Sequence, residues 1–366
     1  MHQLFIQIPG IVLAAYLITQ FFNSYRVEEI WGKLKYRMKW IPAILIVLPL
    51  IYYAWQRPLF FGDTYAYKLI YDGIPSSLSG LSSYLAAHPS DPGYAVLQCI
   101  VKSMGIDYQG LLLIVAVSSV IPLLVVYRKC SSNFFFSIIL FIIGVDYFSW
   151  MWNGMRQFLA ASITFMAAPY IFDKEYIKAI LLIFLASLFH QSALIVLPVI
   201  FIVQGKPFNT RTMMIIFLSL GAVFLVDVFT DVLDKTMQTT QYATVVSDYQ
   251  TGVVGQDDGT NPLRVAVYAV PTLLAIVRYK IINYRDDTVI NICVNMSIIS
   301  TCLYLISMVT SGIFIGRLPI YFSLYNLILL PWEIRYMFTD RSRPIVLVLC
   351  VVLYLVFYYY QMFIVW

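Results

Sequence analysis

Two segments of the chain carry residues that could bind an anionic group and accept a proton. Asn153, Arg156 and Gln157 stand at the start of one apolar run, and His190 with Gln191 interrupts another. A guanidinium group binds phosphate oxygens in pairs. An imidazole, with an ordinary pKa near 6.5, can accept a proton at neutral pH. The two segments therefore indicate group transfer from a phosphate-bearing substrate.

Further candidates lie in polar segments or at the ends of apolar runs. They are Arg57, Asp63, Asp91, Tyr94, Arg264 and Arg317. Each has an ordinary structural alternative, because arginine at a span end often reaches to the membrane surface. Aspartate in a loop is commonly solvated or forms a turn. His190 could likewise be held by a backbone carbonyl at a helix break.

The elements that position these residues are expected to be membrane helices. Of the 366 residues, 61% are apolar and only 12% are charged, and the mean hydropathy is +0.80. Soluble domains carry about 25% charged residues. This composition excludes a soluble enzyme, a nucleic-acid-binding domain and a disordered chain. It predicts an all-α, polytopic integral membrane protein.

The apolar runs predict about 12 transmembrane segments within a single membrane domain, residues 1–366. They are residues 4–22, 40–56, 109–127, 133–150, 155–172, 177–189, 191–204, 212–231, 262–279, 288–310, 316–333 and 344–364. The segments 177–189 and 191–204 are each too short to cross a bilayer. We therefore expect a short helical hairpin whose turn holds His190 in the outer leaflet.

Lysine and arginine residues set the expected orientation. Cytoplasmic loops are enriched in these residues, and the stretch 23–39 contains five of them. Placing it in the cytoplasm puts both termini outside and gathers the candidate residues on the outer face. The external loops 57–108 and 232–261 are long enough to act as lids or binding segments.

The sequence lacks the motifs of metal-dependent enzymes, nucleotide hydrolases and serine hydrolases. The sequence has no HExxH, Walker or GxSxG motif and no cysteine-histidine cluster, so we expect neither a metal nor a cofactor. Asp257 and Asp258 are weak evidence for a cation site. The five cysteines lack CxxC spacing, and most lie within apolar runs, where cysteine behaves as a small apolar residue.

A lipid diphosphate fits arginines that face outward at this depth. Its tail would lie in the outer leaflet, and pyrophosphate leaves readily once its charge is neutralised. The acceptor would be a sugar hydroxyl, a weak nucleophile, whose proton His190 could take. A positioned base accelerates such a step by roughly 10²–10⁴-fold. Asp91 remains an alternative base.

Four motifs together resemble the EpsG-like branch of the Wzy polysaccharide polymerases. They are Arg57 with Gly62-Asp63-Thr64 and Tyr67; Asp91-Pro92-Gly93-Tyr94; Asn153-Gly154-Met155-Arg156-Gln157-Phe158-Leu159-Ala160; and Ala186-Ser187-Leu188-Phe189-His190-Gln191-Ser192-Ala193-Leu194. Gly316-Arg317 is similar to an outer-face arginine of that family. The resemblance covers about residues 40–320. The first motif departs from the family's pattern, which often has a longer basic-Gly-Asp-x-x-x-Tyr string.

The resemblance implies a glycosyltransferase that polymerises polysaccharide on the outer face of the bacterial cytoplasmic membrane. Such proteins transfer a growing glycan from undecaprenyl diphosphate onto the non-reducing end of a lipid-linked repeat unit. The product is an O-antigen, capsule or exopolysaccharide. Neither nucleotide sugar nor metal is implied. The implied partners are the undecaprenyl-diphosphate-linked oligosaccharide, the lipid bilayer, a flippase and a chain-length regulator, with no nucleic acid.

On this interpretation the candidate residues fall into two groups. Arg156 and Arg317 would hold the diphosphate, and His190 would act as base or orienting group. The expected substrate-binding residues are Arg57, Asp63, Asp91, Tyr94, Asn153, Gln157, Gln191 and Arg264.

Two other functions stay open. A membrane O-acyltransferase also uses an embedded histidine, but its acyl donor usually arrives from the cytoplasmic side. A flippase or transporter of lipid-linked glycans should carry ionisable residues in the middle of several spans, between repeated halves. The sequence shows no repeat, and its predicted midspans are nearly free of charge. Formation of a new glycosidic bond would separate a polymerase from a transporter.

Overall fold

The computed structural model describes residues 2–87, 90–226, 259–310, 312 and 315–365. These residues fall into two compact units. Unit 1 comprises Met1–Leu197 and Leu330–Trp366, and unit 2 comprises Pro198–Leu329. Each unit is described by itself below, and the single membrane domain stays a prediction. Most of the predicted external loop 232–261 lies outside the described residues.

Helices dominate both units, as the sequence predicted. Unit 1 contains α1 (His2–Thr19), α2 (Trp40–Trp55), α3 (Thr64–Gly73), α4 (Leu81–Ala87), α5 (Pro92–Ser103), α6 (Tyr108–Cys130), α7 (Phe134–Ile143), α8 (Asp146–Asn153), α9 (Met155–Phe165), α10 (Ala168–Phe172), α11 (Tyr176–Ser187), the 3₁₀ helix η2 (Gln191–Ile195) and α21 (Arg343–Tyr359). Unit 2 contains α13 (Thr210–Phe224), α16 (Pro262–Val277), α17 (Tyr279–Arg285), α18 (Thr288–Val309), η3 (Ile315–Arg317) and α19 (Ile320–Ser323). The helices α12 (Val196–Ile202) and α20 (Asn326–Met337) cross the boundaries between the units.

Many helices begin at a residue whose side chain accepts a hydrogen bond from the first turn. Asp107 accepts from the Gly110 N–H at 2.9 Å at the start of α6. Asn133 caps α7 in the same way, and Asn209 caps α13. A cap of this kind satisfies a backbone donor that the helix itself leaves unpaired, and it contributes about 1 kcal/mol. These capping residues therefore set the position at which each helix begins.

The count of 12 spans is not confirmed. Each predicted segment contains a helix, but in the described residues only Tyr108–Cys130, Thr288–Val309 and Arg343–Ile364 are long and apolar enough to cross a membrane. Two bent pairs raise this number to five, if each pair is one span. Several of the remaining segments are helices of 10–17 residues. Sequence hydropathy gives the length of an apolar run but does not detect breaks in the helix within that run.

One such break lies between α7 and α8, which are bent by 67°. Val145 has φ +66° and ψ −66°, and the Asp146 N–H donates to the Gly144 carbonyl across it at 2.8 Å. This tight turn ends α7 and redirects the chain. It brings the end of α8, at Asn153, to the candidate site described below.

The stretch 23–39 is a β-hairpin, so the all-α prediction was wrong there. Strands β1 (Tyr25–Ile30) and β2 (Lys33–Met38) pair in antiparallel register, with Ile30 opposite Lys33. The two-residue turn has positive φ at both Trp31 and Gly32, at 52° and 66°. Such turns match the twist of paired strands. The strand Lys33–Met38 in fact alternates charged and apolar residues, a strand pattern that the interpretation of 23–39 as a basic cytoplasmic stretch overlooked.

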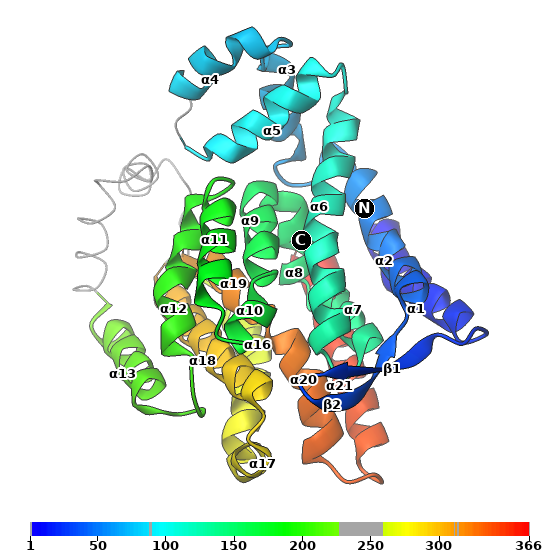
Figure 1. The fold of residues 1–366 in the computed structure, drawn as a ribbon, viewed down its shortest axis with the longest axis vertical. Coiled ribbons are helices and arrows are strands. Elements are labelled where there is room, and N and C mark those ends of the chain that lie inside the picture. Colours follow the sequence, from blue (N-terminus) through cyan, green and yellow to red (C-terminus); the bar gives the residue numbers. More distant parts are fainter. Residues whose placement is uncertain (1, 88–89, 227–258, 311, 313–314, 366) are drawn as a thin grey trace. The chain divides into compact units, whose positions relative to one another are not determined.

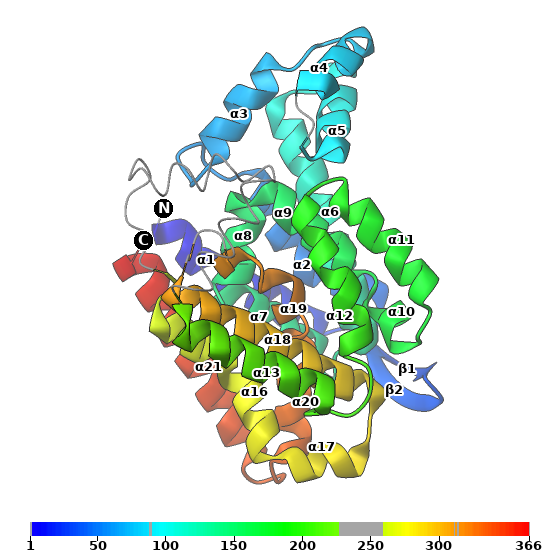
Figure 2. The same cartoon turned by 90° about the vertical axis from the view of Figure 1, so that its left-hand side faces the viewer.

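The predicted external loop 57–108 is largely helical. It forms a cap of α3, α4 and α5, which lies beyond the ends of α9 and α11 within unit 1 (Figures 1 and 2). Buried side chains of the cap, among them Tyr71, Tyr94 and Cys99, form one apolar cluster with Leu111 of α6 and Leu159 of α9. The cap is therefore packed onto the bundle through its core.

Below the cap, unit 1 is a bundle in which neighbouring helices pack along their length. The α2 helix contacts α1 and α6, and α9 contacts α6 and α11. In unit 2, α18 packs against α13, α16 and η3. Four of the five cysteines are buried, and all five are free thiols, as their apolar surroundings predicted.

Candidate functional site

The structure joins Arg156 to Asp91 by an ion pair. The Arg156 Nη1 atom lies 2.8 Å from Asp91 Oδ2. The carboxylate side chain is 5% exposed, whereas the guanidinium side chain is 41% exposed. Asp146, in the first turn of α8, is buried as well. The ion pair leaves part of the guanidinium accessible to a ligand.

Asp91 is held in place by its backbone and by a second hydrogen bond. It has φ +55°, a left-handed conformation that aspartate tolerates better than most residues. Its other oxygen, Oδ1, accepts from the Gln191 N–H at 3.4 Å. Burial raises the pKa of the Asp91 carboxyl, although Arg156 and the Gln191 N–H oppose this shift. The carboxylate thus bridges α9 and the turn that carries His190.

Gly93 allows this approach between the cap and the histidine turn. Its N–H donates to the Leu188 carbonyl at 2.7 Å. A Cβ atom at position 93 would lie 2.8 Å from the Leu188 Cβ and 3.0 Å from its carbonyl oxygen. Only glycine fits this contact without displacement. The Asp-Pro-Gly sequence is therefore a docking element as well as a turn.

His190 occupies the predicted break. The α11 helix ends at Ser187, and η2 begins at Gln191. The His190 Nδ1 atom lies 2.6 Å from the Ser192 hydroxyl oxygen. The His190 side chain is half-buried and that of Gln191 is exposed. The break between two short helical segments, predicted from the length of the apolar runs, is confirmed.

Arg57 is buried next to the first residue of α9. Its Nη2 atom contacts the Met155 sulfur, and its side chain is 5% exposed. The Tyr108 phenol lies within hydrogen-bonding reach. Burial lowers the pKa of the Arg57 guanidinium, while Tyr108, Tyr94 and Tyr67 act in the opposite direction. Arginine nevertheless stays protonated, so the site keeps a buried positive charge.

Tyrosines surround the two arginines of unit 1. Tyr67 lies beside both guanidinium groups and is within hydrogen-bonding reach of Arg156. The Tyr94 side chain is 3% exposed, and its hydroxyl has no hydrogen-bond partner among the described residues. Burial raises the pKa of this phenol, so it stays a neutral donor. A buried donor without a partner is rare and favours a site that a ligand completes.

Asp63 and Asn153 meet through the backbone. The Asp63 N–H donates to Asn153 Oδ1 at 2.8 Å. The preceding Gly62 has φ +47°, and a Cβ there would overlap the Asn153 amide. The Asp63 side chain is exposed, and it makes no capping hydrogen bond to α3. This contact fixes the segment after Arg57 against the end of α8. Gln157, in the first turn of the following helix α9, is buried.

The remaining two predicted arginines belong to unit 2. Arg264 lies in the first turn of α16, and Arg317 ends η3; both are half-buried. Their segments adjoin, because a Cβ at Gly316 would lie 2.7 Å from the Thr260 hydroxyl. The Ser307 hydroxyl of α18 donates to the same Thr260 oxygen at 2.8 Å. Unit 2 thus carries two arginines on neighbouring backbone segments.

Sequence reasoning found the residues of unit 1 that the structure brings together. Asp91, Arg156 and Gln191 are in direct contact, as are Asp63 and Asn153. Tyr67 and Met155 lie within the quoted motifs but were given no role in the site, and Tyr108 was not singled out. Tyr67 follows Asp63 by one helical turn, and this spacing could have placed it on the same face. The contacts of Tyr108 and Met155 with Arg57 depend on the packing of α6 against α9, which no local pattern indicates.

The fold and the site define a multi-pass helical membrane protein with an arginine- and histidine-containing site. The EpsG family model matches residues 39–365, and the chain belongs to this family of Wzy-like polysaccharide polymerases. The match extends beyond the motifs to nearly the whole chain. Comparison with curated proteins and with solved structures gives no match.

Proposed function

We propose that this protein is a polysaccharide polymerase that uses lipid-linked substrates. It transfers a growing glycan from undecaprenyl diphosphate onto the non-reducing end of a lipid-linked repeat unit, on the outer face of the bacterial cytoplasmic membrane. The bond between the anomeric carbon and the diphosphate breaks, and a glycosidic bond to the acceptor oxygen forms. The diphosphate leaves with the bonding electron pair, and the acceptor proton passes to a base.

The observation that carries the proposal is the ion pair between Arg156 and Asp91. It presents a half-exposed guanidinium at the start of α9, beside a turn that carries a histidine. Such a guanidinium can bind a phosphate oxygen while its other side stays fixed by the carboxylate. Stabilisation of the departing diphosphate by pre-placed donors is usually the largest contribution to catalysis of this kind. The buried Arg57 adds positive charge nearby.

His190 is the proposed base. To accept a proton at Nε2, the imidazole must carry its own proton at Nδ1. The Ser192 hydroxyl, 2.6 Å from Nδ1, can accept a hydrogen bond from that proton and so favours this tautomer. Ser192 therefore serves as a positioning residue.

The other polar residues of unit 1 have supporting roles in the proposal. Asp91 orients Arg156, and Asn153 holds the segment that carries Asp63. Tyr94, Gln157 and Gln191 offer donors or acceptors to the acceptor sugar. The roles of Arg317 in binding diphosphate and of Arg264 in binding substrate rest on the sequence, and they are tested separately.

The test is a polymerisation assay with purified full-length protein in detergent. Lipid-diphosphate repeat unit is added without nucleotide sugar or metal, and the products are separated by size on a gel. We expect a ladder from the wild type, and single repeat units from His190→Ala and Arg156→Ala. Lys68→Gln, which alters an exposed ion pair on α3, is the control and should give the wild-type ladder.

Two results would contradict the proposal. A competent substrate that stays monomeric with the wild type would exclude polymerisation, and a flipping assay in vesicles would then test transport. A wild-type ladder from His190→Ala would remove this residue from catalysis and leave Asp91 as the candidate base.

A further inference from the structure

The β-hairpin of residues 25–38 lies at the opposite end of α6 from the candidate site. Tyr108, beside Arg57, begins this helix, and Arg128 is in its last turn. The helix between them rises roughly 30 Å at 1.5 Å per residue. This is about the thickness of the hydrocarbon core of a bilayer. The hairpin therefore stands near the second surface of the membrane.

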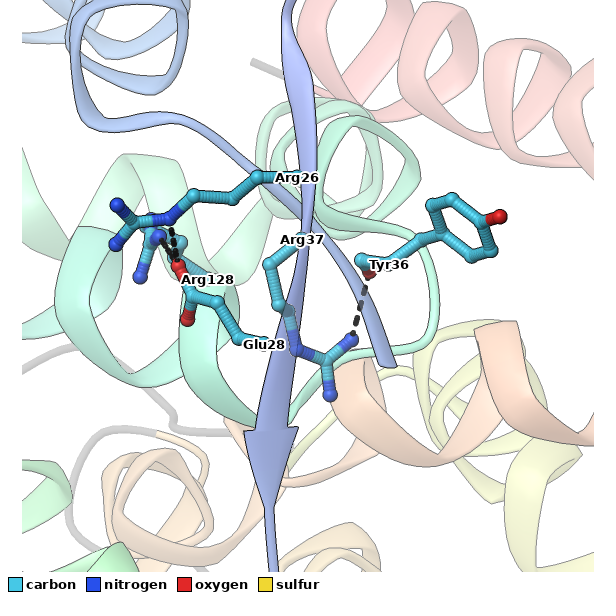
Figure 3. A network of polar contacts seen from close by, with 5 residues as sticks. All are labelled: Arg26, Glu28, Tyr36, Arg37 and Arg128. Carbon is cyan, nitrogen blue, oxygen red and sulfur yellow. Dashed lines mark hydrogen bonds and ion pairs between the residues drawn. The ribbon is translucent and has the colours of Figure 1, made fainter. Parts of the chain in front are cut away.

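The inner face of the hairpin is charged. Because strand residues alternate and paired residues share a face, Arg26 lies opposite Arg37, and Glu28 lies opposite Lys35. Figure 3 shows Arg26 and Arg128 converging on the carboxylate of Glu28. Arg37 Nη1 instead donates to the Ser131 carbonyl at 2.7 Å. One carboxylate thus serves two guanidinium groups.

Two lysines extend this charge over Trp31 in the turn. The Lys35 and Lys129 ammonium groups lie 5.0 and 5.3 Å from the centre of the indole ring. The indole N–H donates to Asp173 at 2.6 Å. The Arg128 guanidinium stacks over the Trp40 ring at 4.2 Å. The face of an aromatic ring attracts a cation, so these contacts help to hold the side chains in place.

The resulting cluster has more cations than anions. Its cations are Arg26, Lys35, Arg37, Arg128 and Lys129, and its described carboxylates are Glu28 and Asp173. Arg37 and Arg128 are each 5% exposed, and the Nε atom of each has no hydrogen-bond partner among the described residues. Burying charged donors in excess of acceptors is costly. A bound anion would offset that cost.

The outer face of the hairpin is mostly apolar and carries one charged residue, Glu29, whereas a sheet in water usually turns its charged face outward. Val27 lies opposite Tyr36, and Leu34 lies opposite the exposed Glu29 on the same face. Leu34 is 77% exposed and Tyr36 is 75% exposed. The exposed Phe22 before the hairpin and Ile41 after it continue the apolar surface onto the ends of α1 and α2. Exposed apolar patches of this kind mark contact with another apolar phase.

We propose that the hairpin is an interfacial anchor that binds anionic phospholipid. Its outer face contacts the acyl-chain boundary through Val27, Leu34 and Tyr36. Its charged side, with Lys35 and Lys129 at the turn, binds the phosphate groups of lipids with a net negative charge. The inverted distribution of apolar and charged residues requires a partner with both an apolar and an anionic part, and a membrane surface has both.

Charge selectivity is tested by native mass spectrometry on the full-length protein in detergent. Phosphatidylglycerol, phosphatidylcholine with the same acyl chains, and glycerol phosphate are titrated separately. We expect tighter binding of phosphatidylglycerol than of phosphatidylcholine. The double variant Lys35→Gln with Lys129→Gln should weaken phosphatidylglycerol binding by roughly fivefold for each lysine removed. Lys68→Gln, at the other end of unit 1, should bind as the wild type does.

Three results of this experiment would overturn the proposal. Equal binding of the two lipids would exclude selectivity for anionic headgroups. Unchanged affinity in the double variant would place the lipid elsewhere. Displacement of phosphatidylglycerol by an equal concentration of glycerol phosphate would indicate a site for soluble anions.

The position of the apolar face is tested independently of the lysines. A spin label is attached to Leu34→Cys in the full-length protein in phosphatidylglycerol-containing liposomes, and the labelling of the natural cysteines is measured on the wild type. We expect oxygen, which concentrates among acyl chains, to relax the spin label faster than a water-soluble nickel chelate does. A label relaxed mainly by the nickel chelate would show that this face meets water and would overturn the proposal. Both readouts are independent of polymerase activity.

Discussion

Arg156 and Asp91 form a 2.8 Å ion pair across 65 positions of sequence. The pair ties the first turn of α9 to the start of α5. The carboxylate is almost fully buried, whereas the guanidinium is only partly so. Asp91 therefore contacts Arg156 from the protein side and leaves the rest of the guanidinium partly exposed. Substitutions at the two positions can therefore separate the effect of the charge of Arg156 from the effect of its orientation by Asp91.

Arg156→Lys should lower the rate of polymerisation by tenfold or more, because lysine keeps the charge but lacks the planar fork that binds two oxygens at once. Asp91→Asn should lower the rate by roughly ten- to a hundredfold, since it removes the negative charge and leaves at most a weaker, neutral hydrogen bond to Arg156. The rate of ladder growth measures both. A wild-type rate for Arg156→Lys would show that charge alone is sufficient.

The stability of the protein should depend on the ionisation of Asp91. Burial raises the pKa of this carboxyl above its ordinary value, and Arg156 offsets the shift only in part. The folded protein therefore binds this proton more tightly than the unfolded chain does. Between the ordinary value, near 4, and the raised value, the contribution of Asp91 to stability falls as the pH rises.

We expect the melting temperature of the wild type to fall relative to that of Asp91→Asn as the pH rises through this interval. Above it, the difference should become constant. Melting curves of both proteins in detergent, from about pH 4 to about pH 7, provide the measurement. A difference with the opposite slope would contradict the direction of the shift. Ionisation of Asp91 also forms the ion pair, so activity should decrease as the pH falls through the raised pKa.

Ser192→Ala should reduce the maximal rate and leave the affinity for the lipid-linked substrate nearly unchanged. The hydroxyl lies 2.6 Å from His190 Nδ1 and contributes the orientation of the ring. We expect a decrease of roughly tenfold, as for loss of one hydrogen bond. Ser192→Thr, which keeps the hydroxyl, should restore most of the rate. A change confined to the Michaelis constant would instead assign Ser192 to substrate binding.

Gly93→Ala should destabilise the docking of the cap by about 1–3 kcal/mol, as expected for overpacking of a close contact. The added methyl group would meet Leu188 at 2.8 Å. Gly73→Ala is the matched control, because a Cβ at that end of α3 meets nothing within 4 Å. Thermal unfolding should separate the two variants. Equal melting temperatures would show that Leu188 moves away at little cost.

Arg317→Ala should abolish ladder formation, and Arg317→Lys should retain part of it, if this arginine binds diphosphate. Loss of one donor to a developing negative charge costs about 10²–10³-fold in rate. Lys206→Gln, which affects an exposed ion pair with Asp286 in the same unit, is the control. A wild-type ladder from Arg317→Ala would remove it from the site.

Hydropathy predicted where helices occur, and a local sequence pattern predicted the break at His190. The apolar runs on either side were too short to cross a bilayer, so a break between them was expected. Hydropathy could not count the spans, since the turn at Val145 divides the predicted segment 133–150 into two short helices. The hairpin at 25–38 was missed because its charged residues suggested a solvated loop.

Local sequence was enough to assign this chain to a membrane, to locate most of its helices and to select the candidate residues. Each of these follows from short stretches of sequence, since each apolar run must leave water and each motif occupies a short segment. The pairing of Asp91 with Arg156, the approach of Gly93 to Leu188 and the position of Tyr67 beside both guanidinium groups became visible only in the folded chain. Contacts of this kind depend on how the cap packs onto α6, α9 and α11. That packing is set by the shapes of side chains far apart in the chain, which no local pattern encodes.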